Sequence, residues 1–220
     1  MPARIVVTEF VSLDGVMEAP GGEPDFKYPG WSFEFERGDD GNEFKLEETR
    51  RADGLLIGKK TYESFAGAWP EREGEFADKF NSMPKFVVST TLKDPEWNNT
   101  TVLDSGDATA QVRKLKEEFD GELQVPGSHR LVQELIESDL VDQINLMVFP
   151  VILGTGKRAI EPTPELLARG RYLFHNVTGC AVCHSPHEPS LSGARIDSSR
   201  IGEGGEAFPL GSAGTLYAKN

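Results

Sequence analysis

Three short segments combine glycine, lysine and hydroxyl side chains at points where a strand is expected to give way to a helix. They are Ile57-Gly58-Lys59-Lys60-Thr61, Val88-Ser89-Thr90-Thr91 and Val125-Pro126-Gly127-Ser128. Such a turn directs free backbone N–H groups at an anion, and the dipole of the following helix adds to the attraction. Glycine allows close approach of the backbone, while the lysines and hydroxyls supply further donors to phosphate oxygens. Together on one sheet edge, these turns predict a dinucleotide site.

Each turn taken alone has a plain structural alternative, because any α/β fold contains strand-to-helix connections. The sequence also lacks the GxGxxG fingerprint and the GxxxxGK[ST] pattern. A Rossmann or nucleotide-triphosphatase interpretation is therefore weak.

A second chemical motif is Cys180-Ala181-Val182-Cys183-His184, which holds both cysteines of the chain. This is the CxxCH spacing of c-type haem attachment: two thiols bond the haem vinyl groups and the adjacent His184 reaches the iron. One alternative is zinc held by Cys180, Cys183 and one or two of His175, His184 and His187; a redox CxxC and a chance pair are the others. All four methionines precede residue 159, so the tail offers no methionine as a second axial ligand.

Composition excludes several classes of protein. The 220 residues carry a net charge of −13, which disfavours nucleic-acid binding. No apolar run approaches the roughly 18–20 residues of a spanning helix, so no membrane span is expected. Two cysteines exclude a disulfide scaffold. The start of the chain shows no secretory signal and predicts a cytoplasmic location, although covalent haem attachment normally takes place outside the cytoplasm.

Strand-like and helix-like segments alternate through the first part of the chain. Helices are expected at 43–52, after Gly58, around Phe76 to Met83, after an Asp107 cap, and after a Ser128 cap. The expected strands are 4–11, 54–57, 85–89, 100–103, 122–125 and 143–151. This βαβ rhythm predicts an α/β fold with a mostly parallel sheet and helices on both faces.

Several of these motifs keep the order and approximate spacing of a known family. FVSLDGVMEAPGG, LLIGKKTYESF, MPKFVVSTTL and VPGSHRLVQELIESDLVDQINLMVFPVILGTGK together resemble the dihydrofolate-reductase-like family, which includes the reductase domain of bacterial riboflavin biosynthesis. The likeness covers residues 3–158. It implies an NADPH-dependent reductase acting on a small molecule, a pterin- or pyrimidine-like heterocycle.

The resemblance also assigns expected roles to residues. Gly58, Lys59, Lys60 and Thr61 would meet the cofactor phosphates, Ser89 and Thr90 the 2′-phosphate, and Gly127 and Ser128 the pyrophosphate and nicotinamide side. Asp14, in a loop that faces nicotinamide and substrate in this family, would orient the heterocycle or help deliver a proton. The alternative is that Asp14-Gly15 is simply a turn. Trp31, Phe33 and Phe35 are expected in the substrate wall or in the core.

The chain is expected to hold two parts, a reductase domain at 1–158 and a cytochrome-c-like fragment at 159–220. The first part carries 18 basic and 30 acidic residues, and the second carries 5 and 6. GRYLFHNVTGCAVCHSPH resembles the opening of class I cytochrome c domains.

Members of the dihydrofolate-reductase-like family usually continue past Arg158 to an antiparallel strand pair at the sheet edge. Loss of that pair would leave an exposed edge and favours a homodimer. Electron transfer through covalent haem c, or an inactive truncated fusion, are the alternative functions.

Overall fold

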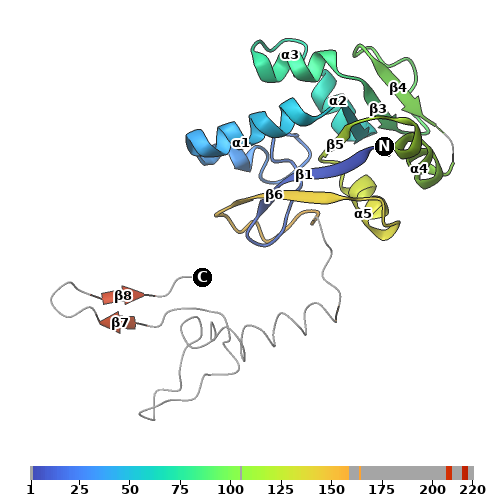
Figure 1. Cartoon of the computed structure of the whole chain (residues 1–220). Coiled ribbons are helices and arrows are strands. Elements are labelled where there is room, and N and C mark those ends of the chain that lie inside the picture. The colour runs from blue at the N-terminus through green and yellow to red at the C-terminus, as the bar shows by residue number, and fades with distance from the viewer. Residues whose placement is uncertain (1, 105, 159–163, 165–206, 210–214, 218–220) are drawn as a thin grey trace. The chain divides into compact units, whose positions relative to one another are not determined.

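The computed structural model describes residues 2–104, 106–158, 164, 207–209 and 215–217 (Figure 1). Contacts divide the chain into two units, Met1–Glu161 and Pro162–Asn220. In the second unit, β7 (Ala207–Pro209) pairs antiparallel with β8 (Thr215–Tyr217). The expected domain boundary after residue 158 stays a prediction. No helix in the described part of the chain is long and apolar enough to cross a membrane.

The first unit is built on a six-stranded sheet in which every pairing is parallel. The order across the sheet is β4-β3-β2-β5-β1-β6. The strands are β1 (Arg4–Ser12), β2 (Gly54–Gly58), β3 (Lys85–Val88), β4 (Thr100–Leu103), β5 (Glu122–Pro126) and β6 (Gln143–Phe149). The expected α/β class is confirmed, and the predicted strands are present within a few residues of their expected bounds. Because all six strands run the same way, their carboxyl ends meet at one edge.

Helices cover both faces of this sheet, as the alternation predicted. They are η1 (Trp31–Glu34), α1 (Gly38–Arg51), α2 (Lys59–Ala66), α3 (Glu75–Ser82), α4 (Ala108–Glu118) and α5 (His129–Glu137). Successive residues of β2 show the division: Leu56 packs in a core with α4 and α5, whereas Leu55 and Ile57 pack in a second core with α2 and α3. This is the two-residue period of a strand that is buried on both faces.

Helix α1 differs from the others because the face that it buries is polar. Lys45, Glu48 and Thr49 are all buried. Lys45 Nζ lies 2.6 Å from Glu48 Oε2 and also donates to the hydroxyl of Thr8 in β1. Asn145 of β6 donates to the other oxygen of Glu48. Since a buried charge is tolerated only when it is paired and hydrogen-bonded, this network is what allows α1 to pack on the sheet.

The buried Lys45–Glu48 pair yields a stability prediction. We expect Lys45→Met or Glu48→Gln alone to lower the free energy of unfolding by about 3–5 kcal/mol, because each leaves its former partner buried without a counter-charge. The double variant Lys45→Met/Glu48→Leu should lose less than either single variant. Urea denaturation monitored by tryptophan fluorescence measures all three.

An exposed ion pair serves as the control. Lys114 and Glu118 lie 3.8 Å apart on α4, with side chains 72% and 65% exposed, and Lys114→Met should cost less than about 0.5 kcal/mol. If Lys45→Met and Lys114→Met lowered the free energy of unfolding equally, the buried network would not be what holds α1 on the sheet.

Candidate functional site

Two of the three predicted turns are joined by one hydroxyl group. Ser128 Oγ accepts a hydrogen bond from the backbone N–H of Gly58 at 2.8 Å and donates to Thr61 Oγ1 at 2.7 Å. A Cβ on Gly58 would lie 3.3 Å from Ser128 Oγ, and one on Gly127 would lie 3.3 Å from Thr61 Oγ1. The turn after β2 and the turn after β5 are therefore in direct contact, and a side chain at either glycine would crowd that contact.

Ser128 does not cap its own helix, so that expectation was wrong. Its backbone is left-handed, with φ 75° and ψ 61°, and its side chain makes no capping hydrogen bond. A capping serine normally has an extended backbone that turns its oxygen toward the first N–H groups of the helix. Here the hydroxyl is turned toward Gly58 and Thr61 instead. The predicted Asp107 cap is confirmed, because its carboxylate accepts from Ala110 N at 2.8 Å.

The third turn, after β3, is linked to the turn after β2 through a lysine. Lys59 Nζ, at the first residue of α2, donates to Thr91 Oγ1 at 3.2 Å. Ser89 Oγ accepts from the backbone N–H groups of Thr91 and Leu92 and so shapes its own turn. Thr90 is exposed. The structure therefore brings the three segments together at the carboxyl edge of neighbouring strands, with their hydroxyls partly used to hold one another.

Asp14 lies in the loop after β1, where its carboxylate has several partners. It accepts from Ser12 Oγ at 2.7 Å, from Leu153 N at 3.1 Å and from Gly154 N at 2.9 Å. Arg158 adds an ion pair at 3.5 Å. Burial alone would raise the pKa of Asp14, but the hydrogen bonds lower it overall. The group is thus an ionised clamp between the loop after β1 and the loop after β6.

The aromatic residues near the start of the chain are divided between the core and the surface. Trp31 is buried against Phe149, with ring centroids 5.4 Å apart, whereas Phe33 is 70% exposed. Phe35 is half-buried, and its ring centroid lies 6.1 Å from that of Phe149. Phe10 of β1 belongs to the same aromatic group, with its ring centroid 5.1 Å from that of Phe149. Its ring lies 5.5 Å from the Arg37 guanidinium and 5.2 Å from Lys45 Nζ.

Sequence reasoning missed the charged groups buried along β1. Glu9 is 4% exposed, and its Oε1 has no hydrogen-bond partner among the residues that the structure describes. Burial raises the pKa of Glu9 well above its usual value, while the charge of Lys45 and a hydrogen bond from the Gly127 backbone N–H oppose that shift. A carboxylate inside an otherwise apolar β-branched run was the available signal. Lys45 and Glu48 had no comparable signal, since their spacing also fits an exposed helix face.

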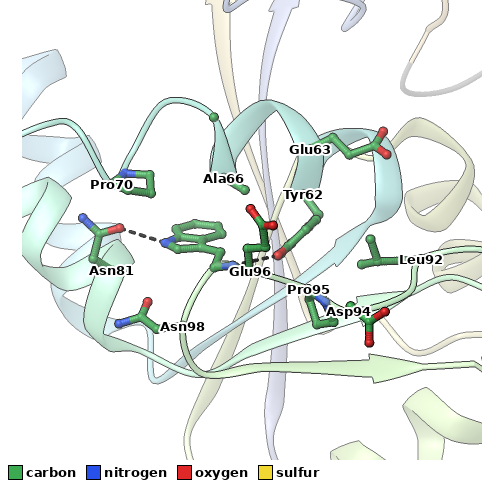
Figure 2. Close-up of a pocket in the computed structure, with 12 residues that line it drawn as sticks. Tyr62, Glu63, Ala66, Pro70, Asn81, Leu92, Asp94, Pro95, Glu96 and Asn98 are labelled. Atoms are coloured by element: carbon green, nitrogen blue, oxygen red, sulfur yellow. Dashed lines mark hydrogen bonds between the residues drawn. The ribbon is translucent and has the colours of Figure 1, made fainter.

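A groove with a volume of about 840 Å³ lies on the α2 side of the sheet (Figure 2). Tyr62, Glu63 and Ala66 of α2 form one wall. The connection from β3 to β4, which includes Leu92, Asp94, Pro95 and Glu96, forms another. Trp97 is held in place by hydrogen bonds with Asn81 and Tyr62. The exposed carboxylates of Glu63, Asp94 and Glu96 would repel phosphate, so this groove does not suit the anionic part of a dinucleotide.

The haem prediction falls on Cys180, Cys183 and His184, which lie outside the residues that the structure describes. Within residues 2–104, 106–158 and the short described segments beyond them, no cluster of three or more His, Cys, Asp and Glu side chains is suited to a metal ion.

The comparisons with known proteins agree on the first part of the chain. A family model described as the RibD C-terminal domain matches residues 3–178, so the match continues past Arg158. Two Bacillus subtilis proteins of uncharacterised function are each 26% identical: YyaP over 70% of this chain and 78% of its own length, and YwjB over 71% and 82%. A candidate riboflavin biosynthesis protein of Shewanella sp. PV-4 has a similar fold. Its TM-score is 0.55 at 21% identity, over 74% of this chain and 85% of that one. None of these findings supports a cytochrome c part.

The clamp role of Asp14 makes a pH-dependent prediction. Asp14→Asn should lower the free energy of unfolding by about 1–2 kcal/mol at neutral pH, because a neutral amide replaces a carboxylate that accepts from two backbone N–H groups. The native pKa lies below the usual 3.8, so this stability is present above about pH 4 and is lost as pH falls through the native pKa. Urea titrations at a series of pH values should show the two proteins converge in acid.

Asp25→Asn, at an exposed carboxylate nearby in sequence, is the matched control and should change little. If Asp14→Asn lowered the free energy of unfolding by the same amount down to the lowest pH, the ionised carboxylate of Asp14 would not be what joins the two loops.

Proposed function

We propose that this chain, which belongs to the RibD C-terminal domain family, is an NADPH-dependent reductase of a pterin- or pyrimidine-like heterocycle. The observation that carries the proposal is the contact between the turns after β2 and β5 through Ser128 Oγ, with the turn after β3 joined to them by Lys59. Neighbouring strand-to-helix turns of this kind suit the phosphates of a dinucleotide. The fold and the family membership support the same class of activity.

The residues at this edge fit an anionic cofactor. Lys59 and Lys60 at the start of α2 supply positive charge, and Thr61 supplies a hydroxyl beside the Gly127 turn. Ser89 and Thr90 in the neighbouring turn are the proposed contacts for the 2′-phosphate. Gly127 and Ser128 would lie along the pyrophosphate and lead toward β1. The missing side chains at Gly58 and Gly127 leave the backbone open to close approach.

NADPH, when bound, supplies the hydride; the chain supplies position and polarity. We place the heterocycle against the half-buried rings of Phe10 and Phe35 on the α1 side of β1, because a planar ring packs favourably on aromatic faces. Arg37 is exposed above Phe10 and supplies a cation for an acidic group of the substrate.

The proposed role of Asp14 is to hold the loop after β6 beside this site. Its carboxylate is ionised at neutral pH, so it orients groups through its hydrogen bonds and has no proton to give. The cytoplasmic location remains a prediction alongside this activity.

Cofactor binding is tested by titrating the purified chain with NADPH and following nicotinamide fluorescence. Saturable binding is expected for the wild type. Lys59→Ala should weaken it roughly tenfold or more, because a charge-assisted hydrogen bond to phosphate is lost. Ser128→Ala should also weaken binding, because it separates the two turns.

Lys114→Ala removes the same charge from the exposed face of α4, outside the three turns, and should leave the affinity unchanged. Absence of saturable binding in a wild type that melts cooperatively would refute the cofactor assignment. An equal loss in Lys59→Ala and Lys114→Ala would attribute the effect to net charge alone.

A further inference from the structure

The carboxyl group of Glu9 is buried toward the carboxyl end of β1. The alternation of the strand puts Glu9 on the same face as Val7, which packs in the core with α4 and α5, and as Val11, which is also buried. An apolar side chain would fill this position without the free-energy cost of burying a carboxyl group. The acid is therefore explained by a polar contact that it makes, and not by packing.

The register of the sheet brings Glu9 beside the turn after β5. Strands β1 and β5 are parallel neighbours (Figure 1), and the last residues in their register are Thr8 and Pro126. Glu9 and Gly127 come next, and the backbone N–H of Gly127 donates a hydrogen bond to the Glu9 carboxyl group. The register partner of Glu9 in β6 is Leu146, which carries no charge. Glu9 thus contacts one of the three turns from within the sheet.

The turn that Glu9 contacts has a backbone conformation that needs support. Gly127 and Ser128 are both left-handed, with φ 75° at each, and a residue with a side chain adopts this conformation at a cost in free energy. Such conformations persist where neighbouring groups hold them from several sides. The Ser128 hydroxyl holds the turn through Gly58 and Thr61. The Glu9 carboxyl group holds it from the sheet.

We propose that Glu9 is a positioning residue, whose carboxyl group fixes the Gly127–Ser128 turn in the conformation that receives the pyrophosphate of the cofactor. The inference rests on the proposed function, because that function assigns the same turn to the cofactor. Glu9 acts through the Gly127 N–H and needs no contact with the cofactor itself. A turn that is already held in its bound conformation loses less freedom when the cofactor binds, which raises the affinity.

The protonation of Glu9 affects this role because the turn receives an anion. Burial raises the pKa of Glu9 well above its usual value, although the charge of Lys45 on α1 and the hydrogen bond from Gly127 oppose that shift. An anion bound at the turn disfavours a second negative charge nearby, so the neutral acid favours cofactor binding and the carboxylate opposes it. Binding should therefore weaken as the pH rises through the pKa of Glu9.

Other charged groups around the turn also contribute to the pH dependence of binding. His129 and Arg130 begin α5, and Lys59 and Lys60 begin α2. Histidine loses its positive charge near neutral pH, and the 2′-phosphate of the cofactor gains negative charge in the same range. These contributions are shared by the wild type and by a variant at Glu9. A comparison of the two proteins therefore isolates the contribution of Glu9.

NADPH titrations of the wild type, Glu9→Gln and Glu9→Leu test the proposal, with nicotinamide fluorescence as the readout. Glu9→Gln keeps an acceptor for the Gly127 N–H but cannot ionise. It should bind like the wild type at about pH 6 and lose several-fold less affinity by about pH 9. Glu9→Leu lacks the acceptor and should bind roughly tenfold more weakly at every pH. Its melting temperature should equal or exceed that of the wild type, because no carboxyl group is buried.

Gln124→Leu is the matched control. Gln124 of β5 is 2% exposed, and its Oε1, like that of Glu9, has no hydrogen-bond partner within the described part of the chain. The substitution removes a buried polar side chain from the neighbouring strand but leaves the acceptor of Gly127 in place, so the affinity should not change. Wild-type affinity in Glu9→Leu, or an equal loss in Gln124→Leu, would overturn the positioning role. Parallel pH profiles in the wild type and Glu9→Gln would overturn it as well, whether or not Glu9→Leu folds.

Hydrogen exchange separates a failure of this inference from a failure of the cofactor assignment. In the cofactor-free chain, the amides of residues 127–129 should exchange faster in Glu9→Leu than in the wild type, Glu9→Gln or Gln124→Leu. This pattern in a wild type that does not bind NADPH would support the contact of Glu9 with the turn and refute the assignment of the cofactor. Unchanged exchange in Glu9→Leu would overturn the inference whatever the turn binds.

Discussion

The hydroxyl of Ser128 is the interaction on which the proposed cofactor site depends. It accepts from the backbone N–H of Gly58 and donates to Thr61, and so fixes the distance between two turns that come from separate strands. Parallel strands bring their carboxyl ends to a common edge, but that geometry alone does not set how closely the turns approach. The left-handed backbone at Ser128, together with two glycines that lack side chains, makes the contact possible.

The sheet also buries charged side chains at β1 and at the helix α1 that packs on it. Glu9, Lys45 and Glu48 are all buried at or near the middle of β1. Burying charge is costly, and here the cost is offset by an ion pair and by hydrogen bonds from Thr8 and Asn145. Proteins retain such departures mostly where function needs them. Glu9 accepts a hydrogen bond from the backbone N–H of Gly127 in one of these turns, and Lys45 Nζ lies 5.2 Å from the Phe10 ring.

The distribution of charge separates the surfaces of the molecule. The start of α2 carries two lysines, the groove beyond it is lined by carboxylates, and the outer edge of β6 has no charge from its own residues. This charge distribution attracts an anionic group to the turns and repels it from the groove.

The sequence by itself determined the α/β class, the bounds of most strands and the three segments that meet at the sheet edge, because alternation, glycine and hydroxyl spacing are local signals. It failed at Ser128, whose residue type predicts a cap, since only the neighbouring turn gives that hydroxyl better partners. It also gave no sign that Lys45 and Glu48 face Thr8, because a polar helix face looks exposed until a strand lies against it. Burial and pairing between distant segments are decided by tertiary structure, since they depend on which strands become neighbours.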